Sequence, residues 1–175
     1  MNLYNMRASF VKQGLLDFIK ILPSELVLVE VGCFSGQSTQ MFLDSGKIKK
    51  IICIDKWENG YDPDDIASNQ TVHAKKIFDN MISKYDNVKV IQEYSDDALK
   101  YIDELVDIVY IDGDHRYEQV KKDIINYTKI IKQTGLISGH DYHLDDVRKA
   151  VNETIGKPEM IFQDHSWRKN IGDIK

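Results

Sequence analysis

The sequence contains few of the features that would indicate an oxidising compartment or a membrane. Its 175 residues include only two cysteines, Cys33 and Cys53, which lack the C-x-x-C spacing of zinc and redox motifs. We therefore expect buried, reduced thiols. No run of eighteen apolar residues occurs, and the N-terminus has no charged segment followed by a long apolar run. These absences predict a cytoplasmic protein with no membrane partner.

An excess of basic charge is also missing. The formal net charge is -5, whereas a protein that binds a nucleic-acid backbone usually has a basic face. This argues against nucleic acid as a partner. With 42% hydrophobic and 29% charged residues, and with no repeat or low-complexity segment, the chain is predicted to be a single domain over residues 1–175.

Apolar patterns alternate between the periods of strands and of helices. Strands are predicted at 26–31, 50–55, 88–92, 106–112 and 136–139, followed by two short strands within 159–174. Helices are predicted at 1–22, 37–45, 74–85, 117–131 and 145–155. This order predicts an α/β fold with a mostly parallel, seven-stranded sheet, helices on both faces and a C-terminal antiparallel hairpin.

The stretch LVLVEVGCFSGQST, residues 26–39, is the most informative motif. A buried strand with Glu30 near its end leads into a loop with glycines at Gly32 and Gly36, which allows a ligand to approach the backbone. The middle glycine of the dinucleotide fingerprint is missing, because Phe34 occupies its place. NAD and FAD are therefore disfavoured, and a ligand with a ribose but no phosphates fits better.

A second carboxylate, Asp55, ends the next strand at about the spacing where an acid binds ribose hydroxyls. A helix cap or a solvated aspartate is the alternative. Ligands of parallel α/β sheets bind at the carboxyl ends of the strands. Five polar residues fall at or close to such ends: Glu30, Asp55, Ser95, Asp112 and Asp141.

Two further stretches are DIVYIDGDHRYEQVKKDI at 107–124 and GLISGHDY at 135–142. Together with residues 26–39 they resemble the class I S-adenosylmethionine-dependent methyltransferases. The resemblance extends over about residues 26–155 and is strongest to small metal-dependent O-methyltransferases of the catechol, macrolide-sugar and cephalosporin-tailoring type. It implies a Rossmann-like methyltransferase fold, S-adenosylmethionine as cofactor, and methylation of a small-molecule hydroxyl on a sugar, polyol or catechol-like acceptor.

The resemblance also implies a set of cofactor-binding residues. These are Glu30, Gly32, Phe34, Gly36 and Ser38 around the glycine loop, Asp55 and Trp57 after the second strand, Ser95 and Asp96 near the adenine, and Asp112 near the methionine part. Two simpler interpretations stay open: the aromatic residues are part of the core, and Ser95 and Asp96 form a helix N-cap.

A divalent cation is the second cofactor that the resemblance implies, held by Asp112, His140 and Asp141. The relatives usually have a carboxylate or an amide at the position of His140, and an imidazole suits a transition metal better than magnesium. The ion is therefore either magnesium or a transition metal. Alternatively, His140 bonds a strand carbonyl and no metal is present.

His115 is the predicted catalytic base, because related enzymes have a lysine or histidine base at its position. An ordinary imidazole, with a pKa of about 6.5, can accept a proton from an acidified hydroxyl at neutral pH. A histidine without chemistry at a helix N-terminus is the alternative, and His143 is a weaker candidate base. The acceptor is expected under residues 1–22 and the loop 56–70.

Three other functions remain. One is a different enzyme of the cephalosporin hydroxylase type, because such proteins share these motifs, a metal site could do other chemistry, and a fold does not determine function. A non-catalytic module could keep the cofactor loop. A nucleic-acid methyltransferase is disfavoured, because the N-P-P-Y or D-P-P-Y tetrapeptide of amino-methylating enzymes is missing. Assembly into a homo-oligomer remains open.

Overall fold

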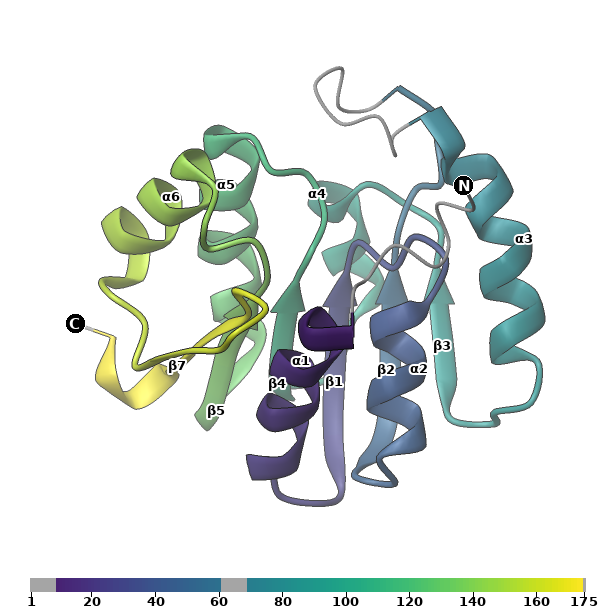
Figure 1. The fold of residues 1–175 in the computed structure, drawn as a ribbon, viewed down its shortest axis with the longest axis horizontal. Coiled ribbons are helices and arrows are strands. Elements are labelled where there is room, and N and C mark those ends of the chain that lie inside the picture. The colour runs from purple at the N-terminus through teal and green to yellow at the C-terminus, as the bar shows by residue number, and fades with distance from the viewer. Residues whose placement is uncertain (1–8, 61–68, 175) are drawn as a thin grey trace.

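The computed structural model describes residues 9–60 and 69–174, which form an α/β sandwich around one seven-stranded sheet (Figure 1). The strand order is β3-β2-β1-β4-β5-β7-β6. The first five strands in the chain are parallel, β7 is antiparallel to β5, and β6 is antiparallel to β7. The strands are β1 (Leu26–Val31), β2 (Ile48–Ile54), β3 (Val88–Ile91), β4 (Val106–Ile111), β5 (Ile131–Gly139), β6 (Met160–Ile161) and β7 (Trp167–Asn170).

Six α-helices cover the two faces of the sheet within the described residues. The helices are α1 (Ser9–Ile21), α2 (Gln37–Asp44), α3 (Thr71–Ile82), α4 (Ser95–Ala98), α5 (Tyr117–Tyr127) and α6 (Asp145–Ile155). Figure 1 shows α1 and α2 side by side in front of the sheet. None of the helices in the described part of the chain is long and apolar enough to cross a bilayer.

The core consists of two hydrophobic clusters, one on each face of the sheet. Because strand side chains alternate between faces, Val29 and Ile52 pack with α5 and α6, while Leu28 and Ile51 pack with α1, α2 and α3. On the second face, the Phe18 ring of α1 lies 6.4 Å from Phe42 of α2 and stacks on Tyr110 at 6.2 Å. Both faces of the sheet are therefore buried under helices, as expected for a parallel sheet.

Strand β1 pairs with β2 on one side and with β4 on the other, so the strand order reverses at β1. The loops after β1 and β4 leave toward opposite faces at such a switch point, and they open a crevice at the carboxyl ends of the strands. Those ends lie at the top of Figure 1.

The predicted sheet, its hairpin and the alternation of strands and helices are confirmed. Several boundaries differ. Helix α3 covers Thr71–Ile82 rather than 74–85, α5 ends at Tyr127, a 3₁₀ turn covers Thr128–Ile130, and β5 begins at Ile131 rather than at 136. The longer β5 passes close to β4 at Gly135, where an added Cβ would lie 2.6 Å from the Asp107 carbonyl oxygen of β4. Only glycine fits at this position. Residues 1–8 and 61–68 of the predicted N-terminal cover and loop lie outside the described part.

Candidate functional site

The glycine loop after β1 lies directly against the loop after β4. Gly32 has a φ of +88°, and an added Cβ would be 2.2 Å from the Asp112 carbonyl oxygen. Gly36, with a φ of +82°, precedes α2, and a Cβ there would be 2.3 Å from Cε of Met81. Both positions therefore need glycine, one for the close approach of two loops and one for the packing of α2 on α3.

The structure places Glu30 away from the predicted cofactor contact. Its side chain is fully buried on the face covered by α2, where Ser38 Oγ and Thr39 Oγ1 each donate a 2.5 Å hydrogen bond to its carboxyl group. The alternation of β1 explains this, because Glu30 shares the face of Leu28 and points into the core. Glu30 and Ser38 therefore hold α2 against β1. Gly36 lies at the N-cap of α2 and allows this helix to pack against α3.

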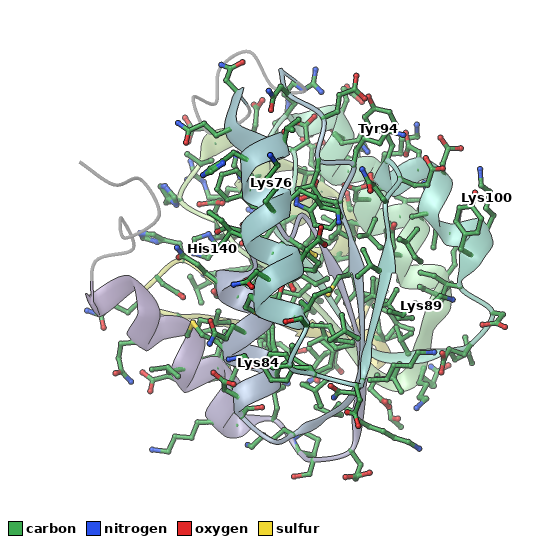
Figure 2. All side chains as sticks on the ribbon, turned by 90° about the vertical axis from the view of Figure 1, so that its right-hand side faces the viewer. Lys76, Lys84, Lys89, Tyr94, Lys100 and His140 are labelled. Carbon is green, nitrogen blue, oxygen red and sulfur yellow. The ribbon has the colours of Figure 1, made fainter. Side chains whose placement is uncertain are left out.

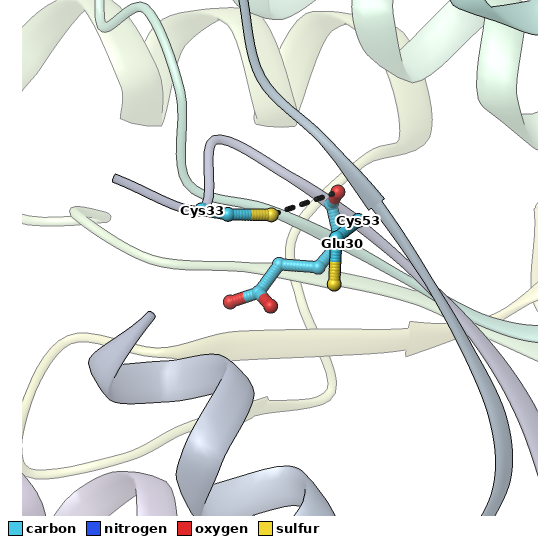
Figure 3. Close-up of side chains that lie close together, drawn as sticks. All are labelled: Glu30, Cys33 and Cys53. Carbon is cyan, nitrogen blue, oxygen red and sulfur yellow. Dashed lines mark hydrogen bonds between the residues drawn. The ribbon is translucent and has the colours of Figure 1, made fainter. Parts of the chain in front are cut away.

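Both cysteines lie beside Glu30 as free, buried thiols, as predicted (Figure 3). The Cys33 thiol donates to the carbonyl oxygens of Glu30 and Ile54, both at 3.7 Å. Burial raises the pKa of both thiols, so neither is inclined to form a thiolate. The three side chains are close enough to suggest a metal site, with ligand atoms within 4.8 Å of one another.

A cavity of about 400 Å³ opens at the carboxyl ends of β1, β2, β3 and β4. Seven of the predicted cofactor-binding residues line it: Gly32, Phe34, Asp55, Trp57, Ser95, Asp96 and Asp112. Its volume is in the range of small-molecule and cofactor sites. Figure 2 shows Tyr94, from the wall of this cavity, well apart from His140, which belongs to the neighbouring cluster described below.

Asp55 organises the middle of this cavity. Its two carboxylate oxygens accept hydrogen bonds from the backbone N–H groups of Phe34, at 2.8 Å, and Trp57, at 2.7 Å. Burial raises the pKa of Asp55, although these N–H groups and the Lys75 charge oppose the rise. Trp57 Nε1 donates to the Phe34 carbonyl at 2.7 Å, so Asp55 and Trp57 join the loops after β1 and β2.

Phe34 and Trp57 both have left-handed backbone conformations, with φ values of 46° and 50°. Such strain in residues with bulky side chains is characteristic of functional sites. The Trp57 side chain is buried against Phe78 at 4.9 Å, so it serves both the core and the cavity wall.

The far end of the cavity is formed by α4 and α5. Gln119 Nε2 donates to Ser95 Oγ at 3.0 Å and to Asp123 Oδ1 at 3.0 Å. Tyr127 donates through its hydroxyl to the Ser95 carbonyl at 2.8 Å. The N-cap of α4 is Tyr94, and no side-chain cap bond is present there, so the N-cap interpretation of Ser95 and Asp96 is wrong.

Sequence reasoning missed Asp123, a cavity-lining residue that is only 1% exposed. Burial raises the pKa of this carboxyl to about 7, helped by the charges of Asp96 and Asp114 and opposed by hydrogen bonds from Ser95 and Gln119. A signal was present: Asp123 follows Val120 by three residues on the apolar stripe of α5, where a carboxylate is unexpected.

A second cluster begins where the first cavity ends. Asp112 lines both the large cavity and a small adjoining one, whose walls include His115, His140 and Asp141. The contacts around Asp141 are short: His115 Nε2 lies 3.0 Å from Oδ2, and His140 Nδ1 lies 3.0 Å from Oδ1. His140 Nδ1 is also 3.6 Å from Asp112 Oδ1. The structure therefore brings together all the predicted metal ligands and the predicted base.

Asp141 holds this cluster in place. Burial alone would raise its pKa, but hydrogen bonds and charges from His115 and His140 outweigh burial and lower the pKa far below its ordinary value. Its φ of 57° is left-handed, a strain typical of functional sites.

The geometry suits a cation. Asp112, His115 and Asp141 each offer a ligand atom, and all three atoms lie within 4.8 Å of one another. The 3.0 Å contact between His115 and Asp141 is a hydrogen bond in this structure. Two carboxylates and an imidazole nitrogen form a donor set of the kind that divalent ions use, and this group includes His115, which the sequence predicts as a base.

His143 and His165 extend the cluster toward the surface, with their rings 4.4 Å apart. His143 Nδ1 is 3.9 Å from Asp141 Oδ1. Burial lowers the pKa of His143, although the Asp141 charge opposes this. Three of the five histidines in the chain thus lie within 4 Å of the Asp141 carboxylate, and a fourth, His165, contacts the His143 ring.

Comparison with known proteins identifies a family for this chain and structures that share its fold. Residues 29–142 match the profile of a family described as a methyltransferase domain. An uncharacterized protein of Acanthamoeba polyphaga mimivirus is 34% identical over 140 residues, which cover 75% of this chain. The match spans 60% of the length of the viral protein, less than two thirds.

Several solved structures share the fold at low sequence identity. The O-methyltransferase NovP has a TM-score of 0.62 and 18% identity, covering 91% of this chain and 78% of its own. An rRNA methylase from Streptococcus thermophilus has a TM-score of 0.60 and 16% identity, covering 85% and 79%. A Streptococcus mutans structure with bound SAH, S-adenosylhomocysteine, has a TM-score of 0.61 and 13% identity, covering 85% and 81%.

Proposed function

We propose that this chain, which belongs to the methyltransferase-domain family, transfers a methyl group from S-adenosylmethionine to a hydroxyl of a small molecule such as a sugar, polyol or catechol-like compound. The observation that carries the proposal is that Asp112 lines both the large cavity and the small one beside the histidine cluster. The large cavity would hold the cofactor, and Asp112 joins that cavity to a cluster of carboxylates and imidazoles. Such a cluster suits the deprotonation of a hydroxyl, which methylation of oxygen requires.

The chain's residues have the groups that this cofactor needs. Each carboxylate oxygen of Asp55 accepts one backbone N–H, from Phe34 or from Trp57, and has a further lone pair. These lone pairs can accept hydrogen bonds from the ribose hydroxyls. The exposed backbone around Gly32 and Gly113 suits the amino-acid part, since no side chain stands in the way. The sulfonium already activates the methyl group, so the protein mainly orients the reactants and excludes water.

His115 is the proposed base. With Nε2 facing the Asp141 carboxylate, His115 accepts the hydroxyl proton at Nδ1, and Asp141 stabilises the imidazolium that forms. Asp112, Asp141 and His140 would hold a divalent ion, with His115 Nε2 as a competing ligand. When bound, such an ion lowers the pKa of a hydroxyl.

The decisive test is the formation of S-adenosylhomocysteine from S-adenosylmethionine in the presence of a panel of sugars, polyols, catechols and RNA. We expect stoichiometric product and a methyl ether with one of the hydroxyl compounds. Methylation of RNA alone would reject the small-molecule acceptor. Binding of the cofactor without turnover on any acceptor would favour a non-catalytic module, and oxidation of an acceptor would favour a hydroxylase.

A further inference from the structure

We infer that His165 is a specificity-determining residue for the acceptor: its imidazole and that of His143 form a wall beside Asp141, and the non-reacting part of the acceptor binds against this wall. His165 takes no part in the proton transfer itself. The inference rests on the proposed methylation of a small-molecule hydroxyl, but not on the presence of a metal.

His165 lies in the tight turn between β6 and β7, and hydrogen bonds within the turn hold its backbone. The N–H of His165 donates to the Phe162 carbonyl at 2.9 Å, and the N–H of Phe162 donates to the Ser166 carbonyl at 2.8 Å. Asp164 is buried, and its Oδ1 accepts the Ser166 N–H at 3.0 Å. Because His165 is exposed, the backbone of the turn rather than burial determines where its ring lies.

The turn contacts helix α1 on one side and the loop after β5 on the other. Gly14 of α1 lies directly against Asp164, since an added Cβ would be 2.3 Å from Asp164 Oδ1 and 2.5 Å from the Asp164 backbone nitrogen. On the other side, the N–H of Tyr142 donates to the His165 carbonyl at 3.2 Å. The turn therefore connects α1, which the sequence predicts to border the acceptor, with the loop that carries Asp141.

The wall lies next to the proposed base. The rings of His143 and His165 are 4.4 Å apart, with their planes inclined by 35°. His143 Nδ1 is 3.9 Å from Oδ1 of Asp141, and His115 Nε2 is 3.0 Å from Oδ2 of the same carboxylate. The His143 side chain is 46% exposed. An acceptor whose reacting hydroxyl lies at His115 is therefore within reach of the imidazole pair across this one carboxylate.

The backbone and the chemistry of His165 both point to a role for its ring. Its φ of 67° is left-handed, a conformation that is uncommon outside glycine and that is found at functional sites. Packing does not require it, because the side chain stays exposed. A neutral imidazole has one N–H donor and one nitrogen acceptor, so it can bond to hydroxyls, and its flat face can pack against a sugar or catechol ring.

The test compares the steady-state kinetics of the wild type and His165→Gly at saturating S-adenosylmethionine. The acceptors are catechol, methyl glucopyranoside and ribitol, and kcat and KM are measured on each one that the wild type methylates. We expect KM in His165→Gly to rise by about fivefold to tenfold with kcat nearly unchanged, because the lost contact stabilises the ground state and the transition state alike. The dissociation constant of S-adenosylhomocysteine, measured by calorimetry, should stay at the wild-type value.

Two further variants separate a contact from a structural role. Glycine adopts the left-handed conformation freely, so His165→Gly should keep the fold, which circular dichroism checks. His165→Asn restores a donor and an acceptor on a residue that tolerates this conformation, and it should recover part of the lost affinity for the acceptor. His73→Ala, at an exposed histidine of α3, is the matched control and should keep the wild-type KM. An unchanged KM in His165→Gly, or a parallel loss of S-adenosylhomocysteine affinity, would overturn the inference. Methylation of none of the three acceptors by the wild type would instead reject the proposed function.

Discussion

Two groups of potential metal ligands lie at the same end of the sheet, and they differ in what surrounds them. Glu30, Cys33 and Cys53 form one group, and Asp112, His115 and Asp141 form the other. The first group is fully buried, and its carboxyl group already accepts two hydroxyl hydrogen bonds. The second group is partly exposed: its Asp112 lines the large cavity, while His115 and Asp141 line the small one beside it.

The comparison teaches that proximity alone does not make a site. In the first group, Glu30 serves to fasten α2, and the raised thiol pKa values disfavour the thiolates that bind metals. In the second, Asp141 is held below its ordinary pKa and is ready to bind a cation or to stabilise an imidazolium. Access and the protonation state of the ligands therefore separate a structural cluster from a reactive one.

The largest expected effect concerns His115. His115→Ala should leave the affinity for S-adenosylhomocysteine nearly unchanged and lower turnover by about 10²- to 10⁴-fold at neutral pH. The loss should be smaller at high pH, where the hydroxyl ionises unaided. A pH–rate profile on the true acceptor is the measurement, and Cys33→Ser from the first group is the control. Near-wild-type turnover in His115→Ala would make His115 structural and move the search for a base to His143.

Metal binding should separate the two groups directly. Titration with Mn²⁺ in a calorimeter should detect binding to the wild type and at least about a 100-fold loss in the double variant Asp112→Asn, Asp141→Asn. The double variant Cys33→Ser, Cys53→Ser should bind like the wild type. Chelation should abolish turnover but preserve cofactor binding. Loss of Mn²⁺ affinity only in the cysteine variant would reverse the comparison.

Two acids on neighbouring strands give a third, smaller contrast. Asp55→Ala should weaken binding of S-adenosylhomocysteine by about 10- to 150-fold, equivalent to about 1.5 to 3 kcal/mol for charge-assisted hydrogen bonds. Glu30→Gln should instead lower the melting temperature by a few degrees, at about 2–4 °C per kcal/mol, and leave the dissociation constant close to that of the wild type. Equal dissociation constants for wild type and Asp55→Ala would remove Asp55 from the cofactor site.

The sequence predicted β1, β2 and β4 well because each is a mostly apolar segment of six or seven residues with a clear end, whereas the start of β5 was missed. It also predicted which residues gather at the carboxyl ends of the strands. It could not predict the direction of the Glu30 side chain, because one residue of register decides whether an acid faces a cavity or a helix. Asp123 was missed for a related reason: its role depends on how α5 packs against α4, and this long-range contact leaves only an acid on an apolar stripe as its trace.

The smallest expected effect concerns the thiols of the first group. Because burial raises the pKa of Cys33 and Cys53 above the ordinary value of 9.0, the folded state keeps its thiol protons at a pH where the unfolded state loses them. The stability that the neutral thiols contribute is therefore fully present below about pH 9 and falls as the pH rises toward the raised values. Chemical denaturation at pH 8 and pH 10 should show this fall in the wild type and little of it in Cys33→Ser, Cys53→Ser.

A thiol-reactive chromogenic disulfide should react with the native protein only at the rate of unfolding, because the thiolate is the nucleophile and neither sulfur is exposed. Rapid labelling of the native protein at pH 8 would show that the first group is open to solvent, and the distinction between the two groups would then have to rest on donor chemistry alone.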